Sequence, residues 1–232
     1  MTRFSHDGED KRRFVRRIFS EIIPRYDFLN RLLTLGMDVR WRKSLAASLE
    51  LRSDDSVLDL SCGTGDVARQ IGRLHPGCRV VGADPVPGML SRAQGKFPAL
   101  AAVCCEAESL PFRDEYFRAV TVAFGVRNFS FLEKGMQEIR RVLMPGGRFG
   151  ILEFAQPDRG WLQGFYRWYL QKLLPRLGAL FSRNDAYQYL PESIQHFPVP
   201  AEFVKLLGSI GFSEMGAERF LGGTVRVYYG RK

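Results

Sequence analysis

The order of hydrophobic and polar positions predicts alternating strands and helices through the middle of the chain. Short apolar runs occur near residues 56, 79, 101, 118 and 148, and stretches with helical spacing separate them. Such alternation is typical of βαβ units, in which a parallel sheet carries helices on both faces. The expected fold class is therefore α/β, with a Rossmann-like and mostly parallel sheet.

The two ends of the chain follow other patterns. Residues 9–50 keep apolar positions three and four apart, which predicts a helical cap that breaks or kinks at Pro24. Residues 213–231 contain two strand-like runs joined by the turn LGGT, which predicts a C-terminal antiparallel hairpin. Five parallel strands and this hairpin together give a seven-stranded sheet.

A glycine-rich turn follows the first apolar run. In VLDLSCGTGDVA (residues 57–68), Gly63 and Gly65 let the backbone turn tightly and approach a ligand, and the next helix offers its N-terminus. The motif by itself fits either the dinucleotide of a dehydrogenase or S-adenosylmethionine.

Two acids at strand ends help to separate these ligands. Asp59 would repel a pyrophosphate but attract the ammonium group of S-adenosylmethionine. Asp84, at the end of the second strand, can bind both ribose hydroxyls of either ligand. In the alternative interpretation, both acids only cap loops or helices.

Composition limits the class of protein. The 232 residues, 45% of them hydrophobic, suffice for one well-packed domain. We divide it into a helical cap (1–50), a cofactor-binding core (51–155), a helical insertion (156–210) and the hairpin (211–232). The four cysteines and three histidines have no metal-ligand spacing, and the N-terminus lacks the apolar core of a secretory signal. We therefore expect no metal, reduced thiols and a cytoplasmic location.

The net charge of +9 favours an acidic ligand or an anionic membrane surface. No nucleic-acid motif accompanies the charge, so no nucleic-acid partner is expected. Residues 161–181 mix basic and aromatic side chains; the basic residues and Pro175 make them a poor membrane span, but they suit a headgroup interface. This predicts peripheral association with the inner face of the membrane. The alternative is that the segment forms a lid on the sheet or a homodimer interface.

Several blocks resemble a known family. Residues 59–65, Asp84, EAESLPF (106–112) and RVLMPGGRFGILEF (141–154) resemble the signature segments of class I S-adenosylmethionine-dependent methyltransferases. Residues 26–43, FGVRN (124–128) and AYQYLPESIQHFP (186–198) resemble blocks of the UbiE/MenG family of quinone C-methyltransferases. The resemblance implies S-adenosyl-L-methionine as cofactor and a prenylated quinol as substrate. That quinol is demethylmenaquinol or, in some members, also 2-methoxy-6-polyprenyl-1,4-benzoquinol.

The resemblance also implies cofactor contacts from Thr64, Asp84, Glu106 and Ala107. The chain departs from the pattern twice. Ser61 stands where the general methyltransferase loop has glycine, and Ala123 stands where several relatives have serine.

Methylation of a ring carbon needs an electron-rich, ionised quinol and no metal. Arg127 and Asn128, at the end of the fourth strand, can donate to a developing phenolate. In the alternative, Arg127 forms a structural ion pair, for instance with Glu153. His196 is a candidate base or a structural residue.

Three tyrosines are candidates for the wall of the quinol pocket, although aromatic residues at helical spacing also build cores. They are Tyr26, Tyr187 and Tyr189. Three functions remain as alternatives to the quinol methyltransferase: methylation of another small hydrophobic or phospholipid substrate, an NAD-dependent oxidoreductase, and a non-catalytic lipid carrier.

Overall fold

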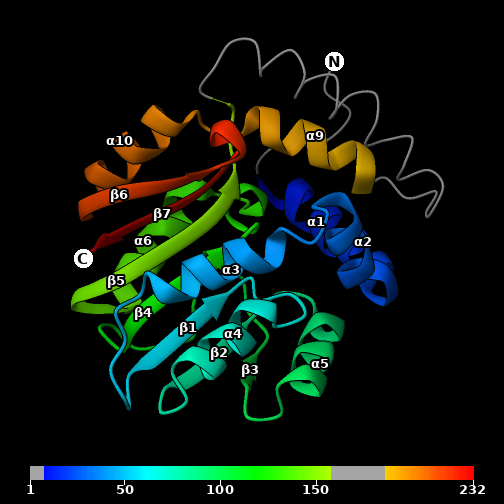
Figure 1. The fold of residues 1–232 in the computed structure, drawn as a ribbon. Coiled ribbons are helices and arrows are strands. Elements are labelled where there is room, and N and C mark those ends of the chain that lie inside the picture. Colours follow the sequence, from blue (N-terminus) through cyan, green and yellow to red (C-terminus); the bar gives the residue numbers. More distant parts are fainter. Residues whose placement is uncertain (1–7, 158–185) are drawn as a thin grey trace.

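The computed structural model describes residues 8–157 and 186–232. In this part of the chain a single seven-stranded sheet has the order β3-β2-β1-β4-β5-β7-β6, with β1 to β5 parallel and β7 antiparallel to both its neighbours (Figure 1). The prediction of a mostly parallel sheet with a C-terminal hairpin is confirmed. The strands are β1 (Ser56–Leu60), β2 (Arg79–Ala83), β3 (Ala101–Val103), β4 (Phe117–Ala123), β5 (Leu143–Phe154), β6 (Ser213–Phe220) and β7 (Val225–Arg231).

Helices cover both faces of the sheet, and this explains the apolar strand sequences. All five residues of β1 are buried, as expected where both faces are packed. Leu58 and Leu60 join a core cluster with α6 (Leu132–Val142) and α10 (Pro200–Ile210). Val57 joins a cluster on the opposite face with α3 (Asp38–Ala47) and α4 (Asp66–Leu74). Side chains alternate along a strand, so Asp59 also faces α4.

The predicted N-terminal cap divides into two parts. α1 (Gly8–Ile22), the 3-10 turn η1 (Ile23–Arg25) and α2 (Tyr26–Leu33) lie beyond the carboxyl ends of the strands, near α9 (Ala186–His196) (Figure 1). Pro24 lies in η1, so the predicted break is confirmed. The third helix, α3, instead packs on the sheet beside α4 because Trp41, Leu45 and Leu49 are buried there.

The remaining described elements connect these layers. α5 (Pro87–Lys96) follows β2, the 3-10 turn η2 (Val126–Asn128) follows β4, and η4 (Leu221–Gly223) joins the hairpin. α10 begins with a proline and is followed by Gly211, whose φ of 98° suits glycine. The segment 161–181 lies outside the described residues. None of the described helices is long and apolar enough to cross a bilayer.

Candidate active site

A cleft lies at the carboxyl ends of β1, β2 and β4, beneath α1. It encloses about 660 Å³, including space open to solvent. Five of the predicted cofactor or catalytic residues line it, namely Gly63, Asp84, Glu106, Ala107 and Asn128. The topology therefore brings together residues from four loops, those after β1, β2, β3 and β4, at the switch point of an open α/β sheet.

Asp84 holds the glycine loop from the end of β2. One carboxylate oxygen accepts a hydrogen bond from the Gly63 amide at 2.9 Å, and the other accepts from the Val86 amide at 2.9 Å. Burial raises the pKa of Asp84 to about 6, against these hydrogen bonds. A carboxylate has further lone pairs, so Asp84 can also accept from vicinal hydroxyls in the cleft.

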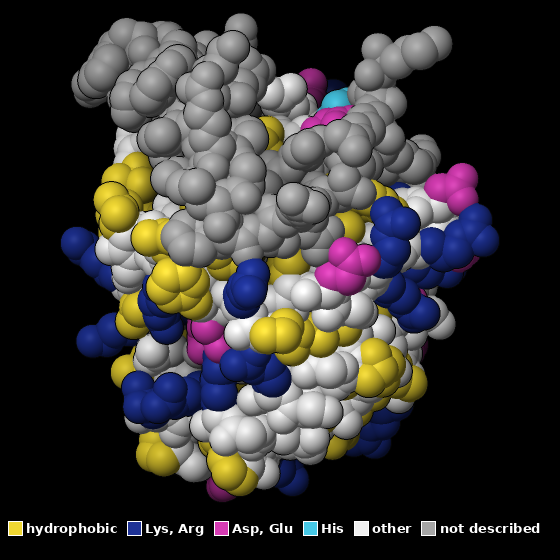
Figure 2. Space-filling view, turned by 90° about the vertical axis from the view of Figure 1, so that its right-hand side faces the viewer, with side chains coloured by type: hydrophobic (Ala, Val, Ile, Leu, Met, Phe, Trp, Pro, Cys, Tyr) yellow, Lys and Arg dark blue, Asp and Glu magenta, His cyan; other side chains and the backbone are white. Residues whose placement is uncertain are grey.

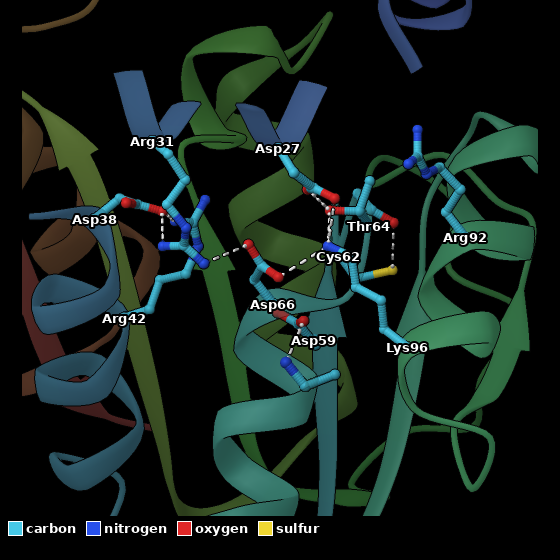
Figure 3. Close-up of polar contacts among 12 residues, drawn as sticks. Asp27, Arg31, Asp38, Arg42, Asp59, Cys62, Thr64, Asp66, Arg92 and Lys96 are labelled. Atoms are coloured by element: carbon cyan, nitrogen blue, oxygen red, sulfur yellow. Dashed lines mark hydrogen bonds and ion pairs between the residues drawn. The ribbon is translucent and has the colours of Figure 1, made fainter. Parts of the chain in front are cut away.

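Thr64 and Gly65 do not belong to the cleft lining. The Thr64 hydroxyl lies among polar groups, donating to Asp27 at 2.5 Å and accepting from Lys96 at 2.8 Å (Figure 3). Gly65 has a φ of 78° directly before α4, and a Cβ there would lie 2.8 Å from the Ala93 Cβ. Both residues thus fix the loop against α2 and α5.

Asp59 is buried behind the loop and is also absent from the cleft lining. Its carboxylate accepts from the Ala68 amide at 3.0 Å and from the Thr121 hydroxyl at 2.9 Å. Burial raises the pKa of Asp59 to about 7. The interpretation of Asp59 as a residue that only caps a loop or helix accounts for these contacts. If Asp59 attracts the ammonium group of the cofactor, it does so from behind the loop, because its carboxylate is not exposed to the cleft.

Two arginines from α1 reach the opposite side of the cleft. The Arg16 guanidinium pairs with Glu106 at 2.5 Å, and Arg12 Nε lies 3.9 Å from the same carboxylate oxygen. Burial raises the pKa of Glu106, and the two arginines oppose this rise. The sequence did not predict this pairing, because no local pattern shows that α1 folds back over Glu106.

An apolar pocket adjoins the cleft between α1, α2 and α9. Its walls include Ile18, Leu29 and Leu190, together with Arg127 and the predicted Tyr189. Three aromatic residues line both cavities, namely Phe19, Tyr26 and Phe124. Burial raises the pKa of the Tyr26 hydroxyl and raises that of Tyr189 to about 12. The structure therefore places two of the predicted tyrosines at an apolar site beside the cofactor cleft.

Arg127 forms the ion pair considered from the sequence. One guanidinium nitrogen lies 2.7 Å from the fully buried Glu153 carboxylate and also donates to the Phe124 carbonyl at 2.6 Å. The buried Nε of Arg127 and the buried Oδ1 of Asn128 have no hydrogen-bond partner among the described residues. Both residues line cavities, so a ligand could satisfy these atoms.

His196 is exposed at the end of α9, where its Nδ1 lies 2.8 Å from the Glu192 carbonyl. It lines a separate groove that also includes Arg127 and Tyr189. Tyr187 is part of α9, but its side chain lies outside the described residues.

Two non-glycine residues in the cleft lining adopt the left-handed backbone conformation. Ser61 has a φ of 53° and Phe124 a φ of 57°, values that favour glycine. A glycine at the Ser61 position would adopt this conformation without strain. Gly125 then becomes necessary, because a Cβ there would lie 2.6 Å from the Ser61 Cβ.

Comparison with known proteins decides the family. The model of the ubiE/COQ5 methyltransferase family matches residues 6–232. The chain belongs to this family.

Curated relatives of this ubiE/COQ5 family member agree with the family assignment. It is 46% identical over 201 residues to a demethylmenaquinone methyltransferase of Thermus thermophilus, covering 84% of this chain and 91% of the relative. It is 40% identical over 239 residues to a ubiquinone/menaquinone biosynthesis C-methyltransferase UbiE of Geobacter sulfurreducens, covering 100% and 92%.

Solved structures resemble its fold at low identity. The [4+2]-cyclase SpnF has a TM-score of 0.71 at 16% identity, with 100% of this chain and 99% of that chain covered. A SAM-dependent methyltransferase from Aquifex aeolicus has a TM-score of 0.60 at 16% identity, with 82% and 88% covered. These likenesses concern the fold.

The cofactor of this enzyme is S-adenosyl-L-methionine, and the cleft fits it. Asp84 presents a carboxylate that can accept from vicinal hydroxyls, and Gly63, with a φ of 52°, presents bare backbone at the cleft wall. The family assignment removes the oxidoreductase and lipid-carrier alternatives.

Proposed function

We propose that this protein methylates a ring carbon of a prenylated quinol, most directly the conversion of demethylmenaquinol to menaquinol. A 2-methoxy-6-polyprenyl-1,4-benzoquinol is the second substrate of the same class. The observation that carries the proposal is the apolar pocket that shares Phe19, Tyr26 and Phe124 with the cofactor cleft. A ring in that pocket would meet the cofactor at these shared aromatic residues.

We assign the cofactor side to residues that line the cleft and to residues that hold its glycine loop. Asp84 binds the ribose, while Glu106 and Ala107 lie at the adenine end. Gly63, Gly65 and Thr64 shape the loop, and Asp59 contributes negative charge behind it. Bound S-adenosylmethionine would supply the electrophilic methyl group. The hydrogen bonds of Thr64 and Asp59 support indirect roles for these two side chains.

The remaining candidates act on the quinol. An ordinary phenol has a pKa near 10 (roughly), so a nearby cation favours the ionised ring. Arg127 would place its unpaired Nε toward the quinol oxygen, and Asn128 would add a polar contact from the cleft. Tyr26, Tyr187 and Tyr189 would enclose the ring. His196, which is exposed and lines the neighbouring groove, would act as the base that accepts a proton from the quinol.

We further propose that the whole chain works as one methyltransferase domain at the cytoplasmic face of an anionic membrane. Support comes from the net charge of +9 and from a substrate class that resides in lipid. A homodimer is the alternative way to cover apolar surface, and light scattering separates it from a monomer that binds vesicles.

The test is transfer of a radiolabelled methyl group from S-adenosylmethionine into demethylmenaquinol by the purified protein. Label in the extracted menaquinol is expected. Label in an added phospholipid instead, with none in the quinol, would favour the other methyltransferase hypothesis.

A further inference from the structure

An exposed apolar strip follows the outer side of α2 and the turn into α3. Phe28 is 56% exposed and Leu35 is 83% exposed, and Leu32 and Val39 are also exposed. Phe28 and Leu32 are four residues apart in α2, so they lie on the same face of the helix. Exposed apolar side chains gathered in one segment point to an interaction surface.

Leu35 is exposed in a conformation that is itself unfavourable. Its φ is 51°, in the left-handed region, and Gly36 follows with a φ of 77°. The turn is held by the Gly36 amide, which donates to the Arg31 carbonyl at 2.8 Å. The chain thus accepts backbone strain and an exposed leucine at one position, a combination that favours a functional explanation.

The acids of this segment are held in ion pairs. Between residues 26 and 43 the acids are Asp27 and Asp38. Asp27 pairs with Lys96 at 2.8 Å, and the buried Asp38 pairs with Arg31 at 2.7 Å and with Arg42 (Figure 3). The exposed charged side chains in the same range are therefore basic, namely Arg31, Arg40 and Lys43.

Part of the strip lies on α2, the short helix that also contributes to the wall of the apolar pocket. Leu29 and Leu33 of α2 line the pocket, whereas Phe28 and Leu32 are exposed. Figure 2 shows the face of the molecule that carries α1 and α2, where apolar and basic side chains lie among one another outside the undescribed residues. An apolar surface with basic neighbours matches the composition that binds the interface of an anionic bilayer.

We propose that the strip formed by Phe28, Leu32, Leu35 and Val39 docks the protein on an anionic lipid bilayer, beside the entrance used by the quinol. The inference rests on the proposed function for its substrate, and it assigns the membrane contact to α2 and the α2–α3 turn. Docking there lets a lipid-soluble quinol enter the apolar pocket with little exposure to water.

The test is co-flotation with vesicles of phosphatidylglycerol and phosphatidylcholine, using the full chain. The variant Phe28→Ser/Leu35→Ser is expected to bind these vesicles about tenfold or more weakly, since each substitution removes a large apolar side chain from the interface. The control Leu74→Ser/Met144→Ser removes two exposed apolar side chains elsewhere and should bind like the unmodified protein. Arg40→Gln/Lys43→Gln should reduce the preference for anionic over neutral vesicles.

Activity provides a separate measurement. Phe28→Ser/Leu35→Ser should methylate a water-soluble, short-chain quinol normally but lose activity, in parallel with vesicle binding, on a long-chain quinol in vesicles. Failure of the unmodified protein to methylate either quinol would refute the proposed function and leave the flotation result to judge the docking surface. Three results would each overturn the docking proposal: vesicle binding that is unchanged in the variant, no vesicle binding by the unmodified protein, or conversion of a dimer to a monomer by the variant.

Discussion

Replacing Arg127 tests the mechanism, provided that its structural role is separated from its chemical one. The Glu153 carboxylate is fully buried and accepts from the Arg127 side chain at 2.7 Å, from the Arg127 amide at 3.3 Å and from the Phe154 amide at 2.9 Å. Arg127→Met leaves this charge with its two backbone donors. Loss of one partner of a buried ion pair typically costs about 3–5 kcal/mol of stability.

The double variant Arg127→Met/Glu153→Gln removes both charges. Its free energy of unfolding should recover much of the loss, because no unpaired buried charge remains. Its rate of methyl transfer should not recover: removal of a donor to a developing oxyanion typically lowers the rate about 10²–10³-fold. Arg127→Lys should retain part of the activity, because lysine keeps the charge but not the planar fork.

The assay is single-turnover methylation at saturating cofactor, with urea unfolding and cofactor titration on the same samples. Raising the pH should partly restore the Arg127→Met variant, because more quinol is then ionised without the cation. Arg148→Met serves as a control. Arg148 lies on β5, the strand that also carries Glu153, but it pairs with the exposed Glu50. If the rate of the double variant recovers together with its stability, Arg127 is structural, and the search for the catalytic group moves to His196.

Three further predictions concern the loop and the cleft. Asp84→Asn should weaken S-adenosylmethionine binding by about 1.5–3 kcal/mol in titration calorimetry. Because the pKa of Asp84 is raised to about 6, the unmodified protein should also lose affinity for the cofactor as the pH falls through 6. The affinity of the variant should not change over this pH range. Asp59→Asn should be more stable than the unmodified protein at pH 7.5, by up to about 4 kcal/mol. The reason is that the pKa of Asp59 is about 7 in the folded protein and roughly 3.9 in the unfolded chain, so burial of the charged carboxylate opposes folding increasingly from pH 4 to pH 7. A stability gap that widens from pH 4.5 to pH 7.5 in urea unfolding would agree with this sign, and a gap that narrows would contradict it. Gly125→Ala should cost about 1–3 kcal/mol through its contact with Ser61, and adding Ser61→Gly should recover part of that loss in thermal unfolding; no recovery would place the strain elsewhere.

The order of apolar runs determined the sheet, because buried parallel strands and their covering helices leave a periodic pattern in the chain. It also predicted the break at Pro24 and the terminal hairpin, both of which are local properties of the backbone. Asp84 and the glycine loop could be predicted to meet because both follow neighbouring strands, and parallel strands end at one edge of a sheet.

The tertiary structure decided which side chains face the cleft. Asp59 follows the alternation of β1 toward α4, and Thr64 turns toward Asp27 and Lys96, so neither lines the cleft that their loop forms. The pairing of Arg16 with Glu106 joins residues that are 90 positions apart in the printed sequence. Such contacts depend on how α1 and α2 fold over the strand ends. Local periodicity does not predict that arrangement, because it depends on packing between segments that are far apart in the sequence.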